Sequence, residues 1–343
     1  MKILHILYSN QYSGAENVVC QIMEQFCNDV NVEMVYCSRD GQIREVLLER
    51  NLPFVPITDL TVKGLKRVLQ EQKPDVVHAH DFRASVISAA AIGGMGIRLI
   101  SHLHNNPPWI RKVNTQSVAY LFAGLFCEKI LLVSDAVGKE YIFNSFLKKK
   151  EVVIGNPINI LAIKAAEVPA EKSDLIFVGR LSEQKNPLRF LQIVSDLQKQ
   201  IPDIQTIVLG DGELRQECEA WVASLGLQKN VKFLGFQKNP YDYMTNSRVL
   251  CMTSDWEGFG LVAVEALSLG KPVVCKPVGG LSGIVEESCG RLCQNDTEYL
   301  EELTKLLQEE TYYMEKSAGA FQRAEALHNI ERYKRTLQEI YRV

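Results

Sequence analysis

The sequence predicts an α/β protein of two doubly wound, Rossmann-like domains whose parallel sheets face each other across a cleft. Three observations carry this prediction. Short β-branched apolar runs alternate with longer helical patterns, the alternation occurs twice, and 343 residues is about the length of two domains. Strands separated by helices form βαβ units, whose parallel sheets are covered by helices on both faces.

The first series occupies residues 1–165. Its short apolar runs predict strands at 2–8, 32–37, 75–79, 97–103, 130–134 and 151–154. Helical patterns lie between them, at 15–27, 41–50, 62–72, 82–93, 114–126 and 135–146. Proline and small residues dilute the pattern from Asn156-Pro157 to Pro169, so we place the domain boundary between residues 165 and 166.

The second series occupies residues 166–325. Strands are expected at 174–178, 204–209, 231–234, 248–252 and 272–276, and helices at 187–200, 212–225, 240–246 and 260–269. The last stretch, 296–343, is helical and charged, with no expected strand. Because ligands of open parallel sheets bind at the carboxyl ends of the strands, we expect the chemistry on the loops that follow strands.

The composition is that of an ordinary globular protein, with 46% hydrophobic and 23% charged residues. It excludes a disordered, collagen-like or disulfide-stapled chain. The net charge of −3 argues against a dedicated nucleic-acid binder. It divides into +3 for residues 1–165, with 18 basic and 15 acidic side chains, and −6 for residues 166–343, with 20 and 26.

Cysteines and apolar runs predict the compartment. The nine cysteines are an odd number and lie mostly in apolar runs, which is typical of buried free thiols in a reducing cytoplasm. The apolar start is interrupted at His5 and is expected as a buried strand rather than a signal peptide. No run approaches the roughly 18 apolar residues of a membrane span.

Four of the six histidines, His78, His80, His102 and His104, lie at the ends of two expected strands. Alternate residues of a strand share a face, so each pair points one way. Zinc ligation, a structural role and contact with a substrate are the three interpretations. No carboxylate or thiol recurs at ligand spacing and Asp-x-Asp is absent, which disfavours the metal. The other two interpretations stay open.

Two cations follow the strand at 174–178. Arg180 comes directly after Gly179 at the strand's mouth, and Lys185 stands five residues later, before the next helix. An arginine fork and a lysine point charge on one loop suit a diphosphate. Solvated loop charges are the alternative.

The most informative segment runs from Ser254 to Gly270. A strand leads through Gly258-Phe259-Gly260 into a helix that ends at Gly270. The amide groups of Phe259 to Leu261 would point out of the helix start toward an anion. Glu257 lies before the helix and Glu265 on it, where carboxylates accept hydrogen bonds from the hydroxyls of a sugar.

Two glycine loops are weaker signals. Ser13-Gly14-Ala15-Glu16 opens a helix after the first strand, where either an anion or an ordinary serine cap fits. Gly210-Asp211-Gly212 is only a Gly-x-Gly. Neither half has Gly-x-Gly-x-x-Gly after a strand, which disfavours a nicotinamide dehydrogenase.

In order, these segments resemble glycosyltransferase family 4, the retaining nucleotide-sugar transferases of the GT-B fold. The matching segments are Gly14-Ala15-Glu16, His104, Gly179-Arg180-x4-Lys185, Gly210-Asp211-Gly212 and Glu257-x7-Glu265. The resemblance covers nearly the whole chain. Its most specific part is Glu-Gly-Phe-Gly-Leu at 257–261 with the second glutamate eight positions on.

The resemblance implies a role for each matching residue. Arg180 and Lys185 would hold the donor diphosphate, Glu257 would meet hydroxyls of the transferred sugar, and Glu265 would meet the ribose. His104 would lie near the donor sugar and the acceptor. These implied roles give a catalytic set of His104, Arg180, Lys185 and Glu257. The donor-binding set is Gly14, Ala15, Arg180, Lys185, Gly210, Phe236, Glu257, Phe259, Gly260, Leu261 and Glu265, with Phe236 in the loop expected at the nucleobase.

The same resemblance implies the division of labour. Residues 1–165 would bind the acceptor, residues 166–325 the nucleotide-sugar donor, and a helix over 326–343 would return to the first domain. The family needs no metal, so we expect no cofactor beyond the nucleotide-sugar itself, with a UDP-sugar favoured and a hexosyl or N-acetylhexosaminyl group transferred.

Two departures from the family pattern concern the donor contacts. Many members have two glycines before the first helix, where this chain has Ser13 and Gly14. Many also have Gly-Gly-x-x-Glu after the 272–276 strand, where this chain has Gly283 in place of the glutamate.

The acceptor side is expected at aromatic and basic residues. Trp109, Arg111 and Lys112 follow directly on His104, with His80 nearby, and residues 143–150 mix Phe with Lys. Such a mixture is typical of contact with anionic lipid, although a solvated loop gives the same pattern. We therefore expect a peripheral protein at the inner membrane face, or a cytoplasmic one, that receives a saccharide or lipid-linked acceptor in polysaccharide or glycolipid synthesis.

Two other functions compete with sugar transfer. A nucleotide-sugar epimerase of the same fold would act on the donor alone, so release of nucleoside diphosphate only with acceptor would separate the two. A non-catalytic sugar-binding protein is disfavoured by the full set of cations and carboxylates.

Overall fold

The computed structural model describes residues 1–163 and 171–342 and divides into two compact units. Unit 1 comprises Met1–Pro157 together with residues from Asn329 onward, and unit 2 is Ile158–His328. The chain thus leaves unit 1 after Pro157 and returns to it after His328. The expected boundary between residues 165 and 166 lies outside the described residues.

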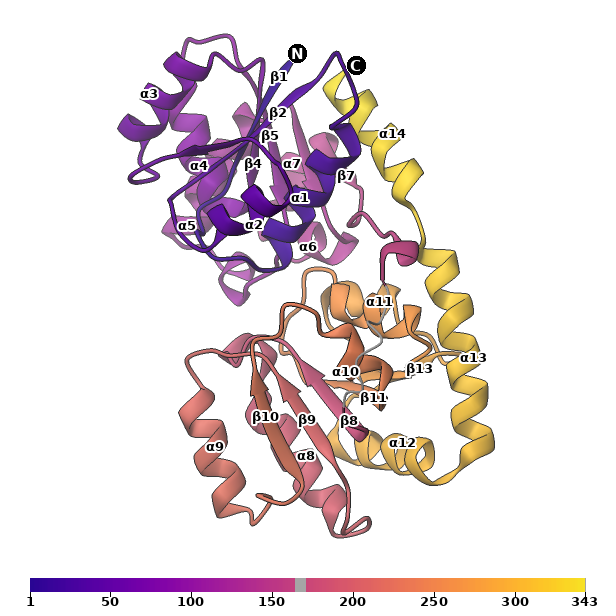
Figure 1. The fold of residues 1–343 in the computed structure, drawn as a ribbon. Helices are drawn as coiled ribbons and strands as arrows, with labels where there is room; N and C mark the ends of the chain where they lie inside the picture. Colours follow the sequence, from indigo (N-terminus) through magenta and orange to yellow (C-terminus); the bar gives the residue numbers. More distant parts are fainter. Residues whose placement is uncertain (164–170, 343) are drawn as a thin grey trace. The chain divides into compact units, whose positions relative to one another are not determined.

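Unit 1 is built on a seven-stranded parallel sheet in the order β3-β2-β1-β4-β5-β6-β7 (Figure 1). Its strands are β1 (Lys2–Ile6), β2 (Glu33–Ser38), β3 (Phe54–Pro56), β4 (Val76–His80), β5 (Arg98–Leu103), β6 (Lys129–Leu132) and β7 (Glu151–Val153). The helices that join them are α1 (Gly14–Phe26), α2 (Ile43–Glu49), α3 (Val62–Gln72), α4 (Asp81–Ala91), α5 (Thr115–Phe126), α6 (Asp135–Lys139) and α7 (Asn144–Leu147).

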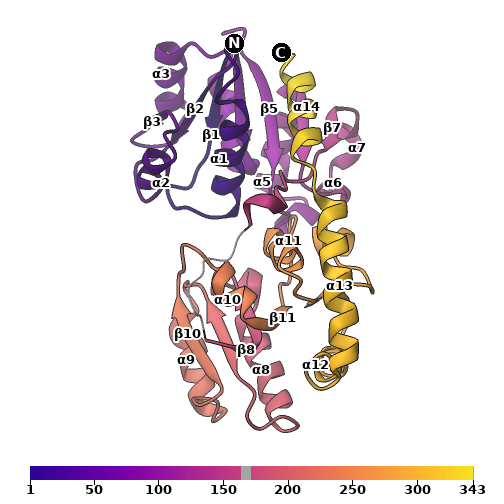
Figure 2. The same cartoon turned by 45° about the vertical axis from the view of Figure 1, so that its right-hand side comes forward.

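Unit 2 repeats the scheme with six parallel strands in the order β10-β9-β8-β11-β12-β13 (Figure 2). Its strands are β8 (Ser173–Val178), β9 (Thr206–Leu209), β10 (Val231–Gly235), β11 (Ser247–Met252), β12 (Val273–Cys275) and β13 (Gly290–Leu292). Its helices are α8 (Pro187–Gln198), α9 (Arg215–Ser224), α10 (Tyr241–Thr245), α11 (Leu261–Ser268), α12 (Asp296–Gln308) and α13 (Glu310–Leu327).

The apolar runs of the strands have a physical reason in unit 2, where both faces of the sheet are buried. Alternate residues of β8 and β11 enter two different cores: Phe177 and Cys251 pack on the side of α8 and α12, while Ile176 and Leu250 pack on the side of α11 and α13. Because helices cover both faces of the sheet, its strands lack the alternating polar residues that a solvent-exposed face would have.

In each sheet the strand order reverses at one place. The first and fourth strands of each unit, β1 and β4 in unit 1 and β8 and β11 in unit 2, lie side by side although they are not consecutive. Loops leave such neighbours in opposite directions, which opens a crevice at their carboxyl ends where ligands bind. Two doubly wound sheets confirm the predicted fold class.

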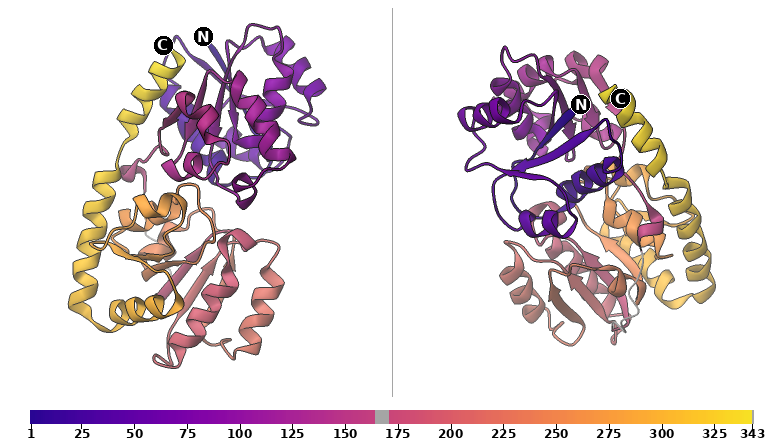
Figure 3. Two further views of the ribbon diagram at one scale, coloured as in Figure 1. Left: turned by 180° about the vertical axis from the view of Figure 1, so that it is seen from behind. Right: turned by 45° about the horizontal axis from the view of Figure 1, so that its top comes forward.

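The last helix, α14 (Ile330–Tyr341), packs on unit 1, as the yellow helix in Figure 3 shows. The guanidinium of Arg98 on β5 donates to the carbonyl oxygens of Ile340 and Tyr341, each at 2.8 Å. The Tyr341 hydroxyl lies 2.7 Å from Nδ1 of His78, and its ring meets Phe26 edge-on. Arg98 and His78 thus hold the last turn of α14 on unit 1.

Three expectations about elements were wrong. The short edge strands β3 and β13 were not expected, and residues 135–146 form α6 and α7 rather than one helix. The helix is interrupted because the amide of Ile142 donates to the carbonyl of Ile110 at 2.9 Å, and the hydroxyl of buried Tyr141 donates to the carbonyl of Ser117.

All nine cysteines are free, and only Cys27 is exposed. Within the described residues, no helix combines the length and the apolar composition that crossing a bilayer requires.

Candidate active site

The central contact of unit 2 is an ion pair between Lys185 and Glu257. The Lys185 ammonium lies 2.5 Å from a carboxylate oxygen of Glu257, and the two side chains are only 17% and 12% exposed. Lys185 follows β8 and Glu257 follows β11, so the pair stands where the strand order reverses. Two residues 72 positions apart, both expected at the donor, are thus in contact.

Hydrogen bonds fasten the two loops that carry this pair. The hydroxyl of Thr253, at the end of β11, donates to the carbonyl oxygens of Lys185 and Asn186. Asn186 has a left-handed backbone (φ 47°), caps α8 by accepting from the amide of Arg189, and donates through its side-chain amide to Asp255. The geometry of the pair is therefore fixed by its surroundings.

A second ion pair lies in the same loops. The Lys276 ammonium, directly after β12, is 2.6 Å from Asp255. Sequence reasoning did not select Lys276. The available signal was a lysine directly after a buried apolar strand, the position that also singled out Arg180.

Arg180 is exposed, and among the described residues its guanidinium makes no ion pair. It stands two residues after β8, on the loop that also carries Lys185. Because no carboxylate of the described residues neutralises it, Arg180 is available to an anion at this edge of the sheet.

The glycines at 210 and 212 are required by packing. A Cβ at Gly210 would lie 1.9 Å from the carbonyl oxygen of Gly179, and one at Gly212 would lie 2.4 Å from that of Leu181. The loop after β9 therefore runs against the loop after β8, with the Leu181 amide donating to the Asp211 carbonyl. Gly210 supports the site through its backbone.

Gly260 is the N-cap residue of helix α11, and its φ of 107° favours glycine. No side chain caps this helix start. A Cβ at Gly260 would also lie 2.5 Å from Leu281. Phe259, Gly260 and Leu261 thus present an uncapped helix N-terminus beside Glu257, an arrangement that favours an anion.

Glu265 lies on the second turn of α11. Burial raises the pKa of its carboxyl group to about 7, and the hydroxyl of Tyr241 on α10 donates to it at 3.3 Å. Phe236 follows β10 and is 57% exposed. Both residues lie at the carboxyl side of the unit 2 sheet.

Unit 1 gathers five histidines on one face of its sheet: His5, His78, His80, His102 and His104. The register pairs His5 with His78 and His80 with His102 on neighbouring strands. Nδ1 of His5 lies 3.0 Å from Nε2 of His80, and Nδ1 of His80 lies 2.8 Å from Nε2 of His104. Sequence reasoning did not include His5, because the contact depends on the register of two strands 75 residues apart.

Burial keeps these rings neutral. It lowers the pKa of His5 and of His104 to about 3 and that of His80 well below its usual value. A neutral imidazole has one donor and one acceptor. If His5 donates to His80 and His80 donates to His104, then His104 accepts at Nε2 and carries its own proton at Nδ1. The reverse order would leave a buried N–H of His5 without a partner, since Nε2 of His5 has none. We therefore assign His104 as a donor at Nδ1.

These histidines also offer the nitrogens that a metal would use. Two triads, His5-His78-His80 and His80-His102-His104, each have ring nitrogens within 4.8 Å of one another. The rings are largely stacked, with His78 and His102 only 13° from parallel. A stack presents faces to its neighbours rather than nitrogens to a common point, so the hydrogen-bonded row describes the cluster better.

Asp81 contacts the histidine row at its His104 end. Its backbone is left-handed (φ 66°), which is uncommon for a residue other than glycine and is concentrated at functional sites. Its carboxyl oxygen accepts the amide of His104 at 2.8 Å, and burial raises its pKa to about 7. Asp81 was not among the expected site residues.

At the start of α1, the first helix of unit 1, the space beside Gly14 is open. The Ser13 hydroxyl donates to the Glu16 carboxylate at 2.5 Å and does not cap the backbone of α1. A Cβ at Gly14 would meet nothing within 4 Å, so packing does not require this glycine. Gly14 and Ala15 therefore lie at an uncapped helix start.

The expected acceptor residues are only partly available. The Trp109 ring packs edge-on against Phe82, and Arg111 pairs with Glu140 at 2.8 Å, whereas Lys112 is exposed. Exposed apolar side chains include Val113, next to Lys112, and further along the chain Phe122, Leu125 and Phe126 of α5 and Phe146 of α7. His80 is buried within the histidine row.

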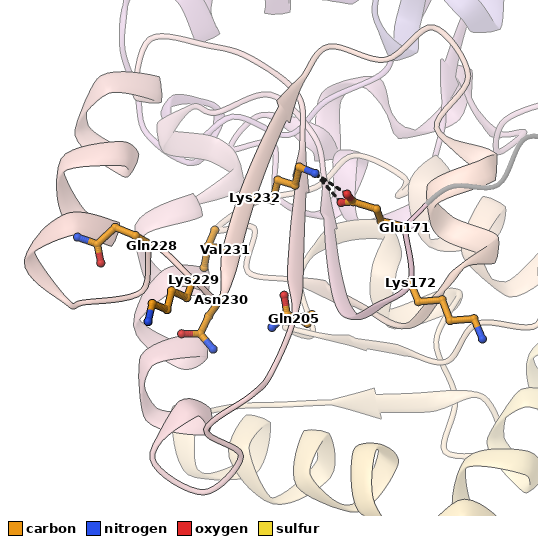
Figure 4. Close-up of a pocket in the computed structure, with 8 residues that line it drawn as sticks. All are labelled: Glu171, Lys172, Gln205, Gln228, Lys229, Asn230, Val231 and Lys232. Carbon is orange, nitrogen blue, oxygen red and sulfur yellow. Dashed lines mark hydrogen bonds and ion pairs between the residues drawn. The ribbon is translucent and has the colours of Figure 1, made fainter.

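A surface pocket of unit 2 contains none of the expected residues. It lies at the amino ends of β8, β9 and β10, where Lys232 pairs with Glu171 (Figure 4). Ligands of doubly wound sheets bind at the other edge, so this pocket carries no part of the candidate site.

Comparison with known proteins identifies the class. Residues 12–160 match the family model described as Glycosyltransferase Family 4, and residues 161–324 match that described as Glycosyl transferases group 1. Together the two models match residues 12–324, which include the described strands of both sheets except β1. The fold and the site therefore define a glycosyltransferase of the GT-B fold.

Individual relatives agree with the class. The chain is 25% identical to a Campylobacter jejuni undecaprenol-diphosphate-saccharide α-1,4-N-acetyl-D-galactosaminyltransferase, over 99% of both chains. It is 24% identical to an Escherichia coli UDP-Gal:α-D-GlcNAc-diphosphoundecaprenol α-1,3-galactosyltransferase, over 83% of this chain and 82% of the relative. An uncharacterized glycosyltransferase of Methanocaldococcus jannaschii is 31% identical, but the match spans 65% of this chain and only 60% of that relative.

A solved structure shares the fold. Anabaena HepE, determined with UDP and glucose, superimposes with a TM-score of 0.89 at 21% identity, over 99% of both chains. The family models, the relatives and the fold together show a GT-B glycosyltransferase that is similar to family 4.

Proposed function

We propose that this glycosyltransferase moves a sugar from a UDP-sugar to a saccharide carried on a lipid diphosphate, with retention at the anomeric carbon. The observation that carries the donor half is the Lys185–Glu257 pair at the carboxyl edge of the unit 2 sheet, with Arg180 on the same loop and without a carboxylate partner in the described part of the chain. Cations suited to binding a diphosphate thus lie beside a carboxylate suited to binding the hydroxyls of a sugar.

The relatives support the choice of substrates. The Escherichia coli relative is named for UDP-galactose, and HepE was determined with UDP. The Campylobacter jejuni and Escherichia coli relatives are both named for acceptors on an undecaprenol diphosphate. Retention rests on the resemblance to family 4.

In the proposed reaction the bond between the anomeric carbon and the diphosphate oxygen breaks, and the acceptor oxygen bonds to the same carbon on the same face. The acceptor hydroxyl proton passes to the departing diphosphate. Arg180 and Lys185 stabilise the charge that grows on that diphosphate, and the neutral His104 donates a hydrogen bond from Nδ1 near the reacting sugar.

The Lys185–Glu257 pair has a place in this scheme. Before the donor binds, each charge neutralises the other in a site that excludes most water. Donor binding gives Lys185 a phosphate oxygen and gives Glu257 sugar hydroxyls, so both keep a partner. The empty site therefore holds its groups in position for the donor.

The protein cations make a metal ion unnecessary in this proposal. Arg180 and Lys185 supply the positive charge that a divalent ion would bring to the leaving diphosphate. Sugar transfer should therefore persist in excess EDTA at its rate without the chelator. A strict requirement for added Mg²⁺ or Mn²⁺ would contradict this part.

The decisive experiment measures UDP release from UDP-sugars with and without a lipid-diphosphate-linked saccharide. We expect release only with acceptor, because an epimerase would need none. Arg180→Ala and Lys185→Ala should each lower kcat by about 10²-fold, as loss of a charge-stabilising group does. Lys232→Ala, which breaks an ion pair at the opposite edge of the sheet, is the control. Full activity of either variant would refute the assignment.

We also propose that unit 1 contacts anionic lipid through an α5–α7 surface, defined as Phe122, Leu125, Phe126 and Phe146 with Lys148 and Lys149. All six side chains are exposed. Gly124 of α5 lies against Leu147 of α7, which brings the two helices together. Exposed aromatic residues beside lysines are typical of interfacial binding.

Vesicle flotation tests this surface. The protein should float with vesicles containing anionic lipid at low salt, and Phe126→Ser with Phe146→Ser should reduce the bound fraction several-fold. Val30→Ser removes an apolar side chain that is 97% exposed elsewhere in unit 1 and should change nothing. Equal flotation of wild type and double variant would refute the proposal.

A further inference from the structure

Two arginines meet on one tyrosine ring at the carboxyl edge of the unit 1 sheet. The guanidinium carbon of Arg83 lies 3.7 Å from the ring centroid of Tyr8, and that of Arg39 lies 4.8 Å from it. Tyr8 follows β1, Arg39 follows β2, and Arg83 is on the first turn of α4 after β4. Because β2, β1 and β4 are neighbours, this Arg39–Tyr8–Arg83 cluster stands where the strand order reverses.

The cluster has positive charge without a counter-ion. Within residues 1–163 and 171–342, neither Arg39 nor Arg83 makes an ion pair. Asp40, next to Arg39 in the chain, is engaged by Arg44 through contacts of 2.7 Å. Nε of Arg39 is buried and lacks a hydrogen-bond partner. An anionic ligand on Arg39 would satisfy this donor.

The arrangement suits a diphosphate. Stacking on Tyr8 restrains both guanidinium groups, although their charges repel. Their separation is less than the sum of the two distances to the ring, a span that one diphosphate bridges. Each guanidinium can bind a phosphate group through two parallel hydrogen bonds. A single carboxylate would leave one arginine without an anion.

The cluster is also close to the histidine row. Asp81, two residues before Arg83, accepts the amide of His104. An anion on Arg83 would thus lie at the same edge of unit 1 as His104. The donor diphosphate already has Arg180 and Lys185 in unit 2, so a second diphosphate site is required only if the acceptor carries one.

We infer that Arg39, Tyr8 and Arg83 bind the diphosphate of a lipid-linked acceptor. This inference rests on the proposed function, which supplies the need for an acceptor diphosphate. The residues that recognise it are assigned from the geometry of unit 1 alone.

Calorimetric titration of the full chain with inorganic pyrophosphate tests the inference. The titration is made in saturating UDP, so that the donor site is occupied. Arg39→Gln with Arg83→Gln should weaken pyrophosphate binding at least tenfold and leave UDP binding unchanged. Arg39→Lys with Arg83→Lys keeps the charge but loses the fork and should weaken it several-fold. Arg67→Gln, which removes an exposed arginine paired with Glu71, is the matched control.

Each result of these titrations supports or overturns the inference. Unchanged pyrophosphate binding in the double Gln variant would show that the arginines only pack on Tyr8, and equal loss in Arg67→Gln would show a general charge effect. Loss of UDP binding instead would assign the cluster to the donor; all three results overturn the inference. If wild type binds pyrophosphate but not UDP, the proposed donor site fails while the Arg39–Tyr8–Arg83 cluster is still tested.

Discussion

Lys185 and Glu257 are each assigned to a ligand, and they also neutralise each other when no ligand is bound. A buried ion pair adds little net stability, but removal of one partner leaves an uncompensated charge that costs about 3 kcal/mol or more. Lys185→Ala should therefore both slow catalysis and destabilise unit 2. The stability loss must be separated from the catalytic loss.

A double variant separates them. Lys185→Met with Glu257→Gln removes both charges and keeps the shape of both side chains, so its unfolding free energy should be within about 1 kcal/mol of wild type. Its sugar-transfer activity should still be lost. Recovery of activity in this stable double variant would show that Lys185 matters only for the fold.

Glu265 predicts a pH dependence of stability. Burial raises its pKa from 4.5 to about 7, so the folded chain holds a proton that the unfolded chain releases at lower pH. The free energy of unfolding should therefore fall as pH rises between about 4.5 and 7. Glu265→Gln should be more stable than wild type at pH 8 by about 3 kcal/mol and similar to it at pH 4.5.

Chemical denaturation at a series of pH values measures this effect. Glu217→Gln, an exposed glutamate on α9, is the control and should shift neither end of the series. A Glu265→Gln variant with the wild-type pH slope would contradict the argument.

The sequence selected candidate site residues that lie near one another in the chain or match a family pattern, and their roles stay predictions. Lys185 and Glu257 were each expected at the donor, but their direct contact was not. His5, Lys276 and Asp81 were missed because their importance depends on strand register, loop packing and backbone conformation. Trp109 was expected at the acceptor or the membrane, and its ring packs on Phe82, a contact that no local pattern encodes.

At the scale of elements, glycines distinguish loops held by packing from loops left open for a ligand. Gly210→Ala places a Cβ 1.9 Å from a backbone oxygen and should cost about 3 kcal/mol. Gly14→Ala meets nothing within 4 Å and should leave stability unchanged while weakening donor binding. Denaturant midpoints and UDP titrations of the two variants check this contrast. Equal destabilisation would mean that Gly14 is held by packing too.

Most strands and helices followed from the alternation of apolar runs with helical patterns, because both faces of these sheets are buried and the runs are unbroken. The exceptions have local causes. β3 ends at Pro56 and β13 begins at Gly290, and each has three residues, too few for a run to stand out. The break between α6 and α7 follows from a distant partner of Ile142 and was invisible to a helical pattern.

At the scale of the whole molecule, Arg98 connects the last helix to unit 1. Its guanidinium donates to Ile340, to Tyr341 and to the carboxylate of Glu128. Arg98→Ala should lower the stability of unit 1 by about 2 kcal/mol, since hydrogen bonds from a charged group are lost. Amides of α14 should then exchange faster by mass spectrometry, with those of α9 in unit 2 as the internal control. Unchanged exchange in α14 would contradict the role of Arg98.

The return of α14 to unit 1 also bears on synthesis at the ribosome. Unit 2 is one continuous stretch, whereas unit 1 is assembled from the beginning of the chain and the residues after His328. Unit 2 can therefore fold as soon as it emerges. In unit 1, by contrast, His78 and Arg98 gain their partners on α14 only after translation has reached Tyr341.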